Sequence, residues 1–290
     1  MNVNFIGVGA IGLPMAMQIR QAGHAVVGMD VMPASRANAE AQGIATVGHI
    51  SDLPAADVVV VMVATPDQLR QVVDDAVARE RTATECWVVM STVGPDSVRE
   101  QGERLRVAGA RVVDAPVTGG TARARTGKLV IFAAGKSADI DAVRPVLAAM
   151  GEPHVTGATL GEGQAIKVVN QHLCSVHIVA AAEALNLARS LGLDPAQVLA
   201  LVEKGAGGSW MLSDRGPRML MDTDVEVTSS INIFVKDSGL VRDAAQSCGA
   251  DVPLLSIAHA RFCETAKAGL GQRDDSRVIE TWRQNADLTH

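Results

Sequence analysis

The segment that most constrains the fold is a glycine-rich turn close to the N-terminus. Gly7-Val8-Gly9-Ala10-Ile11-Gly12 ends an apolar run at residues 3–8 and opens a helical pattern at residues 13–22. In a G-x-G-x-x-G pattern the first glycine permits a tight turn, the second lets a pyrophosphate approach, and the third lets helix and strand pack closely. The free N–H groups at the helix N-terminus then bind phosphate. These residues predict a dinucleotide site, against the alternative of a strand–turn–helix that binds no nucleotide.

An acidic residue ends the next predicted strand. Asp30 follows the apolar residues 25–29, near the spacing of about 20 residues at which a carboxylate reaches the ribose hydroxyls of a bound dinucleotide. Its charge repels the 2′-phosphate of NADP, and Arg36 lies beyond Pro33 rather than directly after the acid. The expected cofactor is therefore NAD, with NADP disfavoured.

Short apolar runs alternate with helical patterns through the first half of the chain. The run Val58–Val63 is continuously apolar, which is typical of a strand covered on both faces. Strands are predicted at residues 3–8, 25–30, 58–63, 87–90, 111–115 and 129–134. Alternating strands and helices predict a parallel, doubly wound sheet. We therefore expect an α/β Rossmann domain over residues 1–160.

The pattern changes at Gly161-Glu162-Gly163. Residues 164–191 contain no Pro or Gly and few charges, which predicts one long helix packed against other helices. Gly192 ends this helix, and Asp194-Pro195 begins the next with a cap and an N1 proline. Further helical patterns follow at residues 194–204, 231–247, 253–268 and 276–285. The expected second domain, residues 161–290, is all-α and opened by the long interdomain helix.

Composition argues against several classes of partner. The net charge of −6, with four Phe, three Trp and no Tyr, disfavours nucleic acid, which needs cationic patches and aromatic stacking. No apolar run approaches the roughly 18 residues of a membrane span. The four cysteines are far apart and form no metal motif, so we expect no metal and reduced thiols in the cytoplasm: Cys86, Cys174, Cys248 and Cys263.

A lysine and two amides follow the glycines on the predicted long helix. Asn170 and Gln171 lie at i+3 and i+4 from Lys167 and share its face. Apolar surroundings lower the pKa of a lysine towards the range useful for proton transfer, and neighbouring amides can hydrogen-bond a hydroxy acid. The alternative is a lysine whose amine reaches solvent from the helix end.

Loops after the later strands should border the same edge of the sheet. By their position, Val63-Ala64 and Thr92 are expected to line the cofactor site. The alternative is that the hydroxyl residues and prolines in these loops only cap and begin the helices that follow. Thr118-Gly119-Gly120 follows the fifth predicted strand. Paired glycines can turn successive N–H groups towards one point and bind a carboxylate, with an ordinary loop as the alternative.

Together these motifs resemble the β-hydroxyacid dehydrogenase family over nearly the whole chain. The resemblance implies a Rossmann domain, a helical domain that often mediates oligomers (a homodimer or homotetramer here), and catalysis between the two. The motifs are Phe5-Ile6-Gly7-x-Gly9-x-x-Gly12-x-Pro14-Met15-Ala16, Ser91-Thr92-Val93-x-Pro95, Asp114-Ala115-Pro116-Val117-x-Gly119-Gly120, Gly127-x-Leu129, Gly163-x-x-x-Lys167-x-x-Asn170, Phe234-x-Lys236-Asp237 and Gly269-x-Gly271-x-x-Asp274-x-Ser276.

The resemblance also implies roles for individual residues. Lys167 is the expected catalytic lysine, and Thr92 is an expected cofactor contact. Lys236 closes over the cofactor, with a surface ion pair to Asp237 as the alternative. The residues expected to hold the substrate are Thr118, Gly119, Gly120, Asn170 and Gln171.

Three positions depart from the family pattern. Thr118 replaces the usual serine and adds a methyl group. Gln171 stands where many members have a second asparagine, and Val63-Ala64 replaces a frequent Leu-Pro.

The expected activity is NAD-dependent oxidation of a small hydroxy acid, or reduction of the matching oxo acid. The stretch Gly208-Ser209-Trp210-Met211 through Pro217 most resembles a branch that oxidises a four-carbon sugar acid such as threonate. Alternatives are 3-hydroxyisobutyrate dehydrogenase or 2-hydroxy-3-oxopropionate reductase activity, imine reduction, and a catalytically silent NAD-binding protein. The pattern assigns no role to Trp210 or to the preceding glycine-rich loop.

Overall fold

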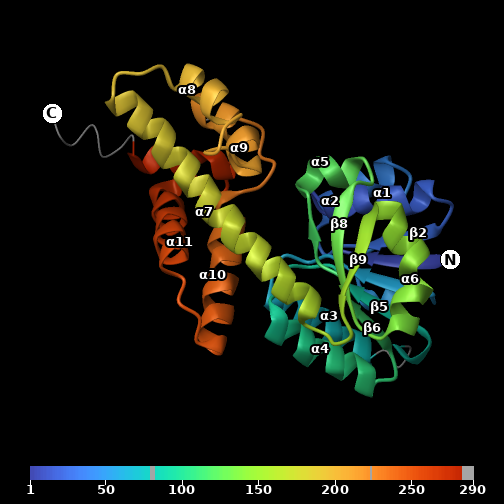
Figure 1. The fold of residues 1–290 in the computed structure, drawn as a ribbon. Coiled ribbons are helices and arrows are strands. Elements are labelled where there is room, and N and C mark those ends of the chain that lie inside the picture. The colour runs from blue at the N-terminus through green and yellow to red at the C-terminus, as the bar shows by residue number, and fades with distance from the viewer. Residues whose placement is uncertain (79–81, 223, 283–290) are drawn as a thin grey trace. The chain divides into compact units, whose positions relative to one another are not determined.

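The computed structural model describes residues 1–78, 82–222 and 224–282, and it divides into two compact units, Met1–Lys167 and Val168–His290 (Figure 1). The division falls within a long helix. The first unit contains β1 (Asn2–Ile6), α1 (Gly12–Gln21), β2 (Ala25–Met29), α2 (Pro33–Ala41), β3 (Ala45–Val47), β4 (Val58–Val61), α3 (Pro66–Ala78), β5 (Cys86–Val89), α4 (Pro95–Val107), β6 (Arg111–Asp114), β7 (Val117–Thr118), α5 (Gly120–Arg125), β8 (Leu129–Ala134), α6 (Ser137–Met150) and β9 (Gly151–Gly157).

The strands form one nine-stranded sheet in the order β3-β2-β1-β4-β5-β6-β8-β7, with β9 paired to β8. From β3 to β6 the strands are parallel, with Val3 opposite Val26 on one side and Val58 on the other. This order confirms the Rossmann fold. The sheet is not wholly parallel, because β8 runs antiparallel to β6 and β7. The connection from β7 to β8 through α5 is shorter than the roughly twelve residues or more that a crossover between parallel strands needs.

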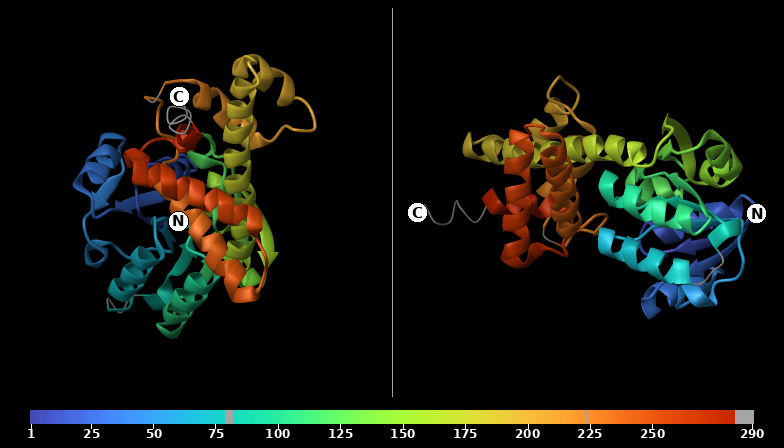
Figure 2. Two further views of the ribbon diagram at one scale, coloured as in Figure 1. Left: turned by 90° about the vertical axis from the view of Figure 1, so that its left-hand side faces the viewer. Right: turned by 90° about the horizontal axis from the view of Figure 1, so that it is seen from below.

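Helices cover both faces of this sheet (Figures 1 and 2). In β4, Val58 and Val60 pack in the core on the face covered by α1 and α6, whereas Val59 and Val61 pack in the core under α3 and α4. All four valines are fully buried. Burial on both faces explains why the sequence of this strand is apolar without alternation.

The second unit is helical in the part of the chain that the structure describes, apart from an isolated bridge between Ser230 and Asp274. Its core gathers apolar side chains from all of its α-helices, and the Phe234 and Phe262 rings stack at 5.0 Å. The helices are α7 (Glu162–Ser190), which begins in the first unit, α8 (Pro195–Val202), α9 (Trp210–Leu220), α10 (Ile231–Cys248) and α11 (Pro253–Thr265).

The predicted ends of the long helix are confirmed, whereas the last predicted helix differs. α7 ends at Ser190 just before Gly192, which has φ +74°, and Asp194 Oδ1 accepts a hydrogen bond from Ala196 N at the start of α8. In place of a helix over residues 276–285, the structure has a 3₁₀ helix at Asp275–Ile279 followed by a short helical stretch to residue 282. Residues 283–285 lie outside the described residues. Among the described helices, none combines the length and apolarity required to cross a bilayer.

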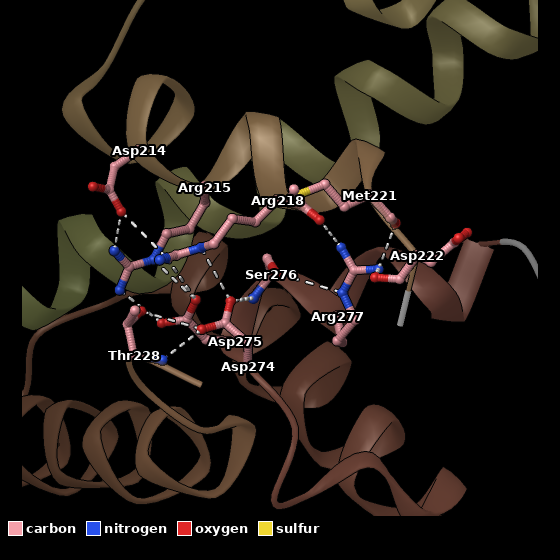
Figure 3. Close-up of polar contacts among 10 residues, drawn as sticks. All are labelled: Asp214, Arg215, Arg218, Met221, Asp222, Thr228, Asp274, Asp275, Ser276 and Arg277. Atoms are coloured by element: carbon pink, nitrogen blue, oxygen red, sulfur yellow. Dashed lines mark hydrogen bonds and ion pairs between the residues drawn. The ribbon is translucent and has the colours of Figure 1, made fainter. Parts of the chain in front are cut away.

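Buried ion pairs tie α9 to the C-terminal segment (Figure 3). The Arg215 guanidinium pairs with both carboxylate oxygens of Asp275, at 2.9 and 2.8 Å, and Asp274 accepts hydrogen bonds from Thr228. Arg277, which is fully buried, donates to carbonyl oxygens at the end of α9: those of Arg218, Met221 and Asp222. Removing one partner of a buried pair costs about 3–5 kcal/mol, so this network fixes the segment in place.

Candidate active site

The glycine-rich turn lies at the carboxyl end of β1, beside β4, where the strand order reverses. Gly7 has φ +92°, and a Cβ there would lie 2.2 Å from the Met62 carbonyl oxygen. A Cβ at Gly12 would lie 1.9 Å from the Gly7 carbonyl oxygen, whereas a Cβ at Gly9 would meet no described atom within 4 Å. Packing therefore requires the first and third glycines. The second leaves open space before the backbone, which fits a pyrophosphate.

The N-terminus of α1 also fits a phosphate. Its N-cap residue Ile11 makes no side-chain capping bond, and no acidic residue lies in the first turn. The side chain of Val8 is buried in the core, and Ala10 is exposed. Leu13 N donates to the Gly9 carbonyl oxygen at 3.0 Å, and Pro14 has no N–H. The N–H groups that could bind an anion here are therefore those at or before Gly12, at the positive end of the helix.

Asp30 follows β2 and is half-buried. Its Oδ1 accepts a hydrogen bond from Met32 N at 2.9 Å, which fixes the carboxylate through a local turn. No donor among the described residues reaches Oδ2. Arg36 folds back and donates to the Asp30 and Val31 carbonyl oxygens at 2.8 and 3.2 Å.

The loops after β4 and β5 are hydrogen-bonded to each other. Val63 N donates to Ser91 Oγ at 2.7 Å, and Ser91 is fully buried. Ala64 N donates to Gln68 Oε1 at 2.8 Å, while Thr92 is half-buried. Val63 and Ala64 thus lie at the carboxyl end of β4, next to β1, and Thr92 follows β5, the next strand of the sheet. Both loops lie on the edge where Rossmann folds bind ligands.

Thr118 ends β7 opposite Val130, and the two glycines after it begin α5. Gly119 has φ +127° and Gly120 φ +64°, both conformations that favour glycine. A Cβ at Gly120 would meet no described atom within 4 Å. The backbone at Gly120 is therefore open to a small ligand.

The first turn of α7 is anchored by side chains that the sequence analysis did not single out. Asp114 Oδ2 accepts hydrogen bonds from Gly161 N and Gln164 N, both at 3.0 Å. Burial raises the pKa of Asp114 to about 6, and the bonds from Gln164, Gly161 and Gly163 oppose that shift. Asp114 is therefore ionised at neutral pH and caps the helix from the end of β6.

Lys167 lies in the next turn of α7 and is 6% exposed. The alternative of an amine held at the surface by a helix end is therefore disfavoured. Asn170 and Gln171 follow one turn later on the same helix, as predicted. Burial of a lysine is the condition that the proton-transfer hypothesis requires.

Four polar residues of the second unit form a continuous chain. Asn170 Nδ2 donates to Gln171 Oε1 at 2.8 Å, and Gln171 Nε2 donates to Asp237 Oδ2 at 2.5 Å. The other oxygen of Asp237 pairs with Lys236 Nζ at 2.8 Å. The structure thus brings Asn170, Gln171 and Lys236 together through Asp237, which is 4% exposed.

Sequence reasoning offered the ion pair of Lys236 with Asp237 as an alternative, and the structure contains this pair with Asp237 buried. It missed the roles of Asp114 and Gln164 and the bond from Gln171 to Asp237. The signal available for Gln164 was a polar residue among apolar ones, just before Lys167. No local signal identifies its partners, which lie 50 residues or more away in the chain. Among the described residues, no group of three or more His, Cys, Asp or Glu side chains could hold a metal ion.

Two family models cover the chain. Residues 2–169 match the NAD-binding domain of 6-phosphogluconate dehydrogenase, and residues 161–282 match the "NAD-binding of NADP-dependent 3-hydroxyisobutyrate dehydrogenase" family. An L-threonate dehydrogenase of Cupriavidus necator is 35% identical, over 96% of this chain and 95% of its own length. The chain belongs to the β-hydroxyacid dehydrogenase family.

Other members of the family support this assignment. A 2-(hydroxymethyl)glutarate dehydrogenase of Eubacterium barkeri is 30% identical over 97% of this chain and 95% of its own. The crystal structure of a 3-hydroxyisobutyrate dehydrogenase from Salmonella typhimurium superposes with a TM-score of 0.89 at 32% identity, covering 97% of this chain and 99% of its own. An imine reductase of Streptomyces aurantiacus, 20% identical with a TM-score of 0.67, shares the fold alone. The chain is an NAD-dependent hydroxyacid dehydrogenase.

Proposed function

We propose that this dehydrogenase oxidises a small hydroxy acid at its carbinol, with Lys167 accepting the hydroxyl proton. The observation that carries the proposal is the buried Lys167, the sixth residue of a helix that starts from the ligand-binding edge of a Rossmann sheet. A desolvated amine loses part of the stabilisation of its charged form, and a buried amine beside a substrate hydroxyl is a candidate for proton transfer.

The residues proposed to hold NAD are those around the glycine-rich turn. The backbone of Gly7–Gly12 holds the pyrophosphate, Asp30 accepts the ribose hydroxyls, and Val63, Ala64 and Thr92 form the wall. NAD, when bound, accepts a hydride from the carbinol carbon. Lys236, oriented by Asp237, contributes the cation that closes over the cofactor.

Asp30 supports NAD rather than NADP as the preferred cofactor, because a fixed carboxylate repels a 2′-phosphate. Asp30→Ala should weaken NAD binding and reduce the discrimination against NADP. Comparing kcat/KM for the two cofactors in both proteins tests this. A wild-type preference for NADP would contradict the role of Asp30.

The proposed substrate site joins open backbone to amide side chains. Thr118, Gly119 and Gly120 hold the carboxylate through backbone N–H groups and the Thr118 hydroxyl. Asn170 and Gln171 hydrogen-bond further hydroxyl groups without adding charge. Holding both ends of a short acid orients its carbinol towards Lys167.

We propose a four-carbon sugar acid as the substrate, because the relatives with 32–35% identity include several L-threonate dehydrogenases. The test is NADH formation with a panel of three- and four-carbon hydroxy acids. Highest kcat/KM with threonate supports the proposal. Preference for 3-hydroxyisobutyrate, or for reducing 2-hydroxy-3-oxopropionate, would reassign the substrate. Failure of every acid to yield NADH would contradict the activity.

The proposed assembly is a homo-oligomer formed along α7. Apolar side chains remain exposed on one side of this helix and directly after its last residue in the single chain: Val169, Leu173, Leu187 and Leu191, at 48–66% exposure. Such a stripe favours a second copy of the chain. Leu173→Glu should lower the mass measured by light scattering, whereas Val107→Glu, at an exposed site on α4, should not. Equal masses would contradict this interface.

We also propose the cytoplasm as the site of action. All four cysteines are free thiols in the structure, and reduced thiols are typical of a reducing compartment. Cell fractionation followed by immunoblotting tests this, and recovery in a secreted fraction would contradict it.

A further inference from the structure

We propose that Gln164 is a positioning residue that fixes the start of α7, and with it Lys167, against the proposed cofactor wall at residues 91–94. This inference rests on the proposed roles of Lys167 and Thr92. Gln164 does not touch the reacting atoms; it acts through the residues that do.

The side-chain amide of Gln164 uses its full hydrogen-bonding capacity. Oε1 accepts from Val93 N and Gly94 N, both at 3.1 Å, and Nε2 donates to the Ser91 carbonyl oxygen at 2.9 Å and to Asp114 Oδ1 at 3.1 Å. Gln164 is fully buried. Two donors and two acceptors on one planar group are the property of a carboxamide, and no charged side chain supplies both.

The contacts of Gln164 join the ends of adjacent strands. Ser91 follows β5 and its Oγ accepts from Val63 N after β4, whereas Asp114 ends β6. Asp114 also caps the first turn of α7 through Gly161 N. One buried side chain thereby joins the ends of β5 and β6 to the helix that carries the proposed catalytic lysine, and the Ser91 hydroxyl extends the connection to the end of β4.

An apolar residue at position 164 could not make the hydrogen bonds that hold the start of α7. Lys167 lies three residues after Gln164, less than one helical turn away. The hydrogen bonds of the Gln164 side chain therefore set the position of the Lys167 backbone. Loss of the amide leaves the Val93 and Gly94 N–H groups and the Ser91 carbonyl buried without these partners. The loop and the helix then shift independently, and a displacement of about 1 Å lowers turnover by about 100-fold.

The first test compares Gln164→Leu with Gln101→Leu. Gln101 is also buried in the first unit, but its Oε1 accepts from Arg104 on the same helix. We expect Gln164→Leu to lower kcat by about 10- to 100-fold with a smaller change in KM for the acid. Hydrogen exchange of the cofactor-free protein should show faster exchange at the amides of Val93 and Gly94. Gln101→Leu should change neither.

The second test is Gln164→Glu, which keeps the shape of the side chain. Its carboxylate faces Asp114 and the Ser91 carbonyl where the wild type has a donor, so activity should fall most at about pH 8, where both carboxylates are ionised. Towards about pH 6 the two groups share one proton, which restores a donor between them. We therefore expect the activity of the variant, relative to wild type at each pH, to recover as the pH falls. A merely structural defect gives a constant ratio.

Two results would overturn the inference: wild-type kcat in folded Gln164→Leu with unchanged exchange at residues 93 and 94, or a pH-independent ratio for Gln164→Glu. Failure of the proposed function is separate, since it appears as full turnover in Lys167→Ala. In that case faster hydrogen exchange at residues 93 and 94 in Gln164→Leu would show that Gln164 holds this loop, but that it has no role in proton transfer.

Discussion

Gly7 and Gly9 lie two residues apart, yet the same substitution should affect them in different ways. At Gly7 an added methyl group meets the Met62 carbonyl oxygen and the φ is +92°, whereas at Gly9 the space is open. We expect Gly7→Ala to lower the free energy of unfolding by about 1–3 kcal/mol. Gly9→Ala should leave stability unchanged and weaken NAD binding by at least about 10-fold, because its methyl group occupies the approach of the pyrophosphate.

Urea denaturation and fluorescence titration with NADH measure the two effects. Equal loss of stability in both variants would contradict the assignment of Gly7 to packing and Gly9 to the cofactor. Normal NADH affinity in Gly9→Ala would show that the pyrophosphate binds elsewhere.

Asp237 is the partner that orients both Gln171 and Lys236. Asp237→Asn keeps the shape but removes the charge that holds the Lys236 ammonium, and its amide nitrogen cannot accept the bond from Gln171. We expect a rise in KM for the acid and for NAD of about 10-fold, corresponding to the loss of a charge-assisted hydrogen bond. Steady-state kinetics with Asp243→Asn as an exposed control checks this. Unchanged KM values would mean that neither side chain depends on Asp237.

At the residue scale the sequence predicted the glycine-rich turn, Lys167 and its amide neighbours, because these residues are close together in the chain. It did not predict that Gln171 bonds Asp237, 66 residues later, or that Gln164 bonds Ser91, 73 residues earlier. Partners at such separations are determined by the packing of helices and strands. A single sequence contains no local pattern for them.

At the scale of elements, the main strands and the long helix were predicted from apolar runs, and their ends were set by glycines. The strands β3 and β7 were missed because each has only two or three residues, and three longer elements were missed because they break propensity rules. β9 contains Pro153 and is half-exposed, α6 contains Pro145, and α9 contains Gly216 and Pro217. Each is held by tertiary contacts, such as the pairing of β9 with β8, that outweigh its local preference.

The junction of β6 with α7 should give stability a distinct pH dependence. The pKa of Asp114 is raised by burial to about 6 from an ordinary value of 3.8, so the folded state binds its proton more tightly than the unfolded state. The resulting stabilisation is present below about pH 4 and is lost as pH rises through about 6, by up to about 3 kcal/mol.

Asp114→Asn removes this titration and keeps one oxygen acceptor for the start of α7. We therefore expect the free energy of unfolding of the wild type, measured by urea denaturation, to decline from about pH 4 to about pH 7. The free energy of unfolding of Asp114→Asn should not show this decline. Parallel pH profiles for the two proteins would contradict the assigned protonation of Asp114.

For the whole molecule, the proposed activity depends on Lys167 exchanging the proton of the substrate hydroxyl. The most direct measurement is the single-turnover rate of NADH formation by Lys167→Ala, beside Lys267→Ala at an exposed site. We predict a fall of about 100- to 10,000-fold for Lys167→Ala, unchanged NAD affinity, partial rescue by added primary amines, and wild-type rates for Lys267→Ala. A wild-type single-turnover rate in Lys167→Ala would show that Lys167 does not exchange this proton.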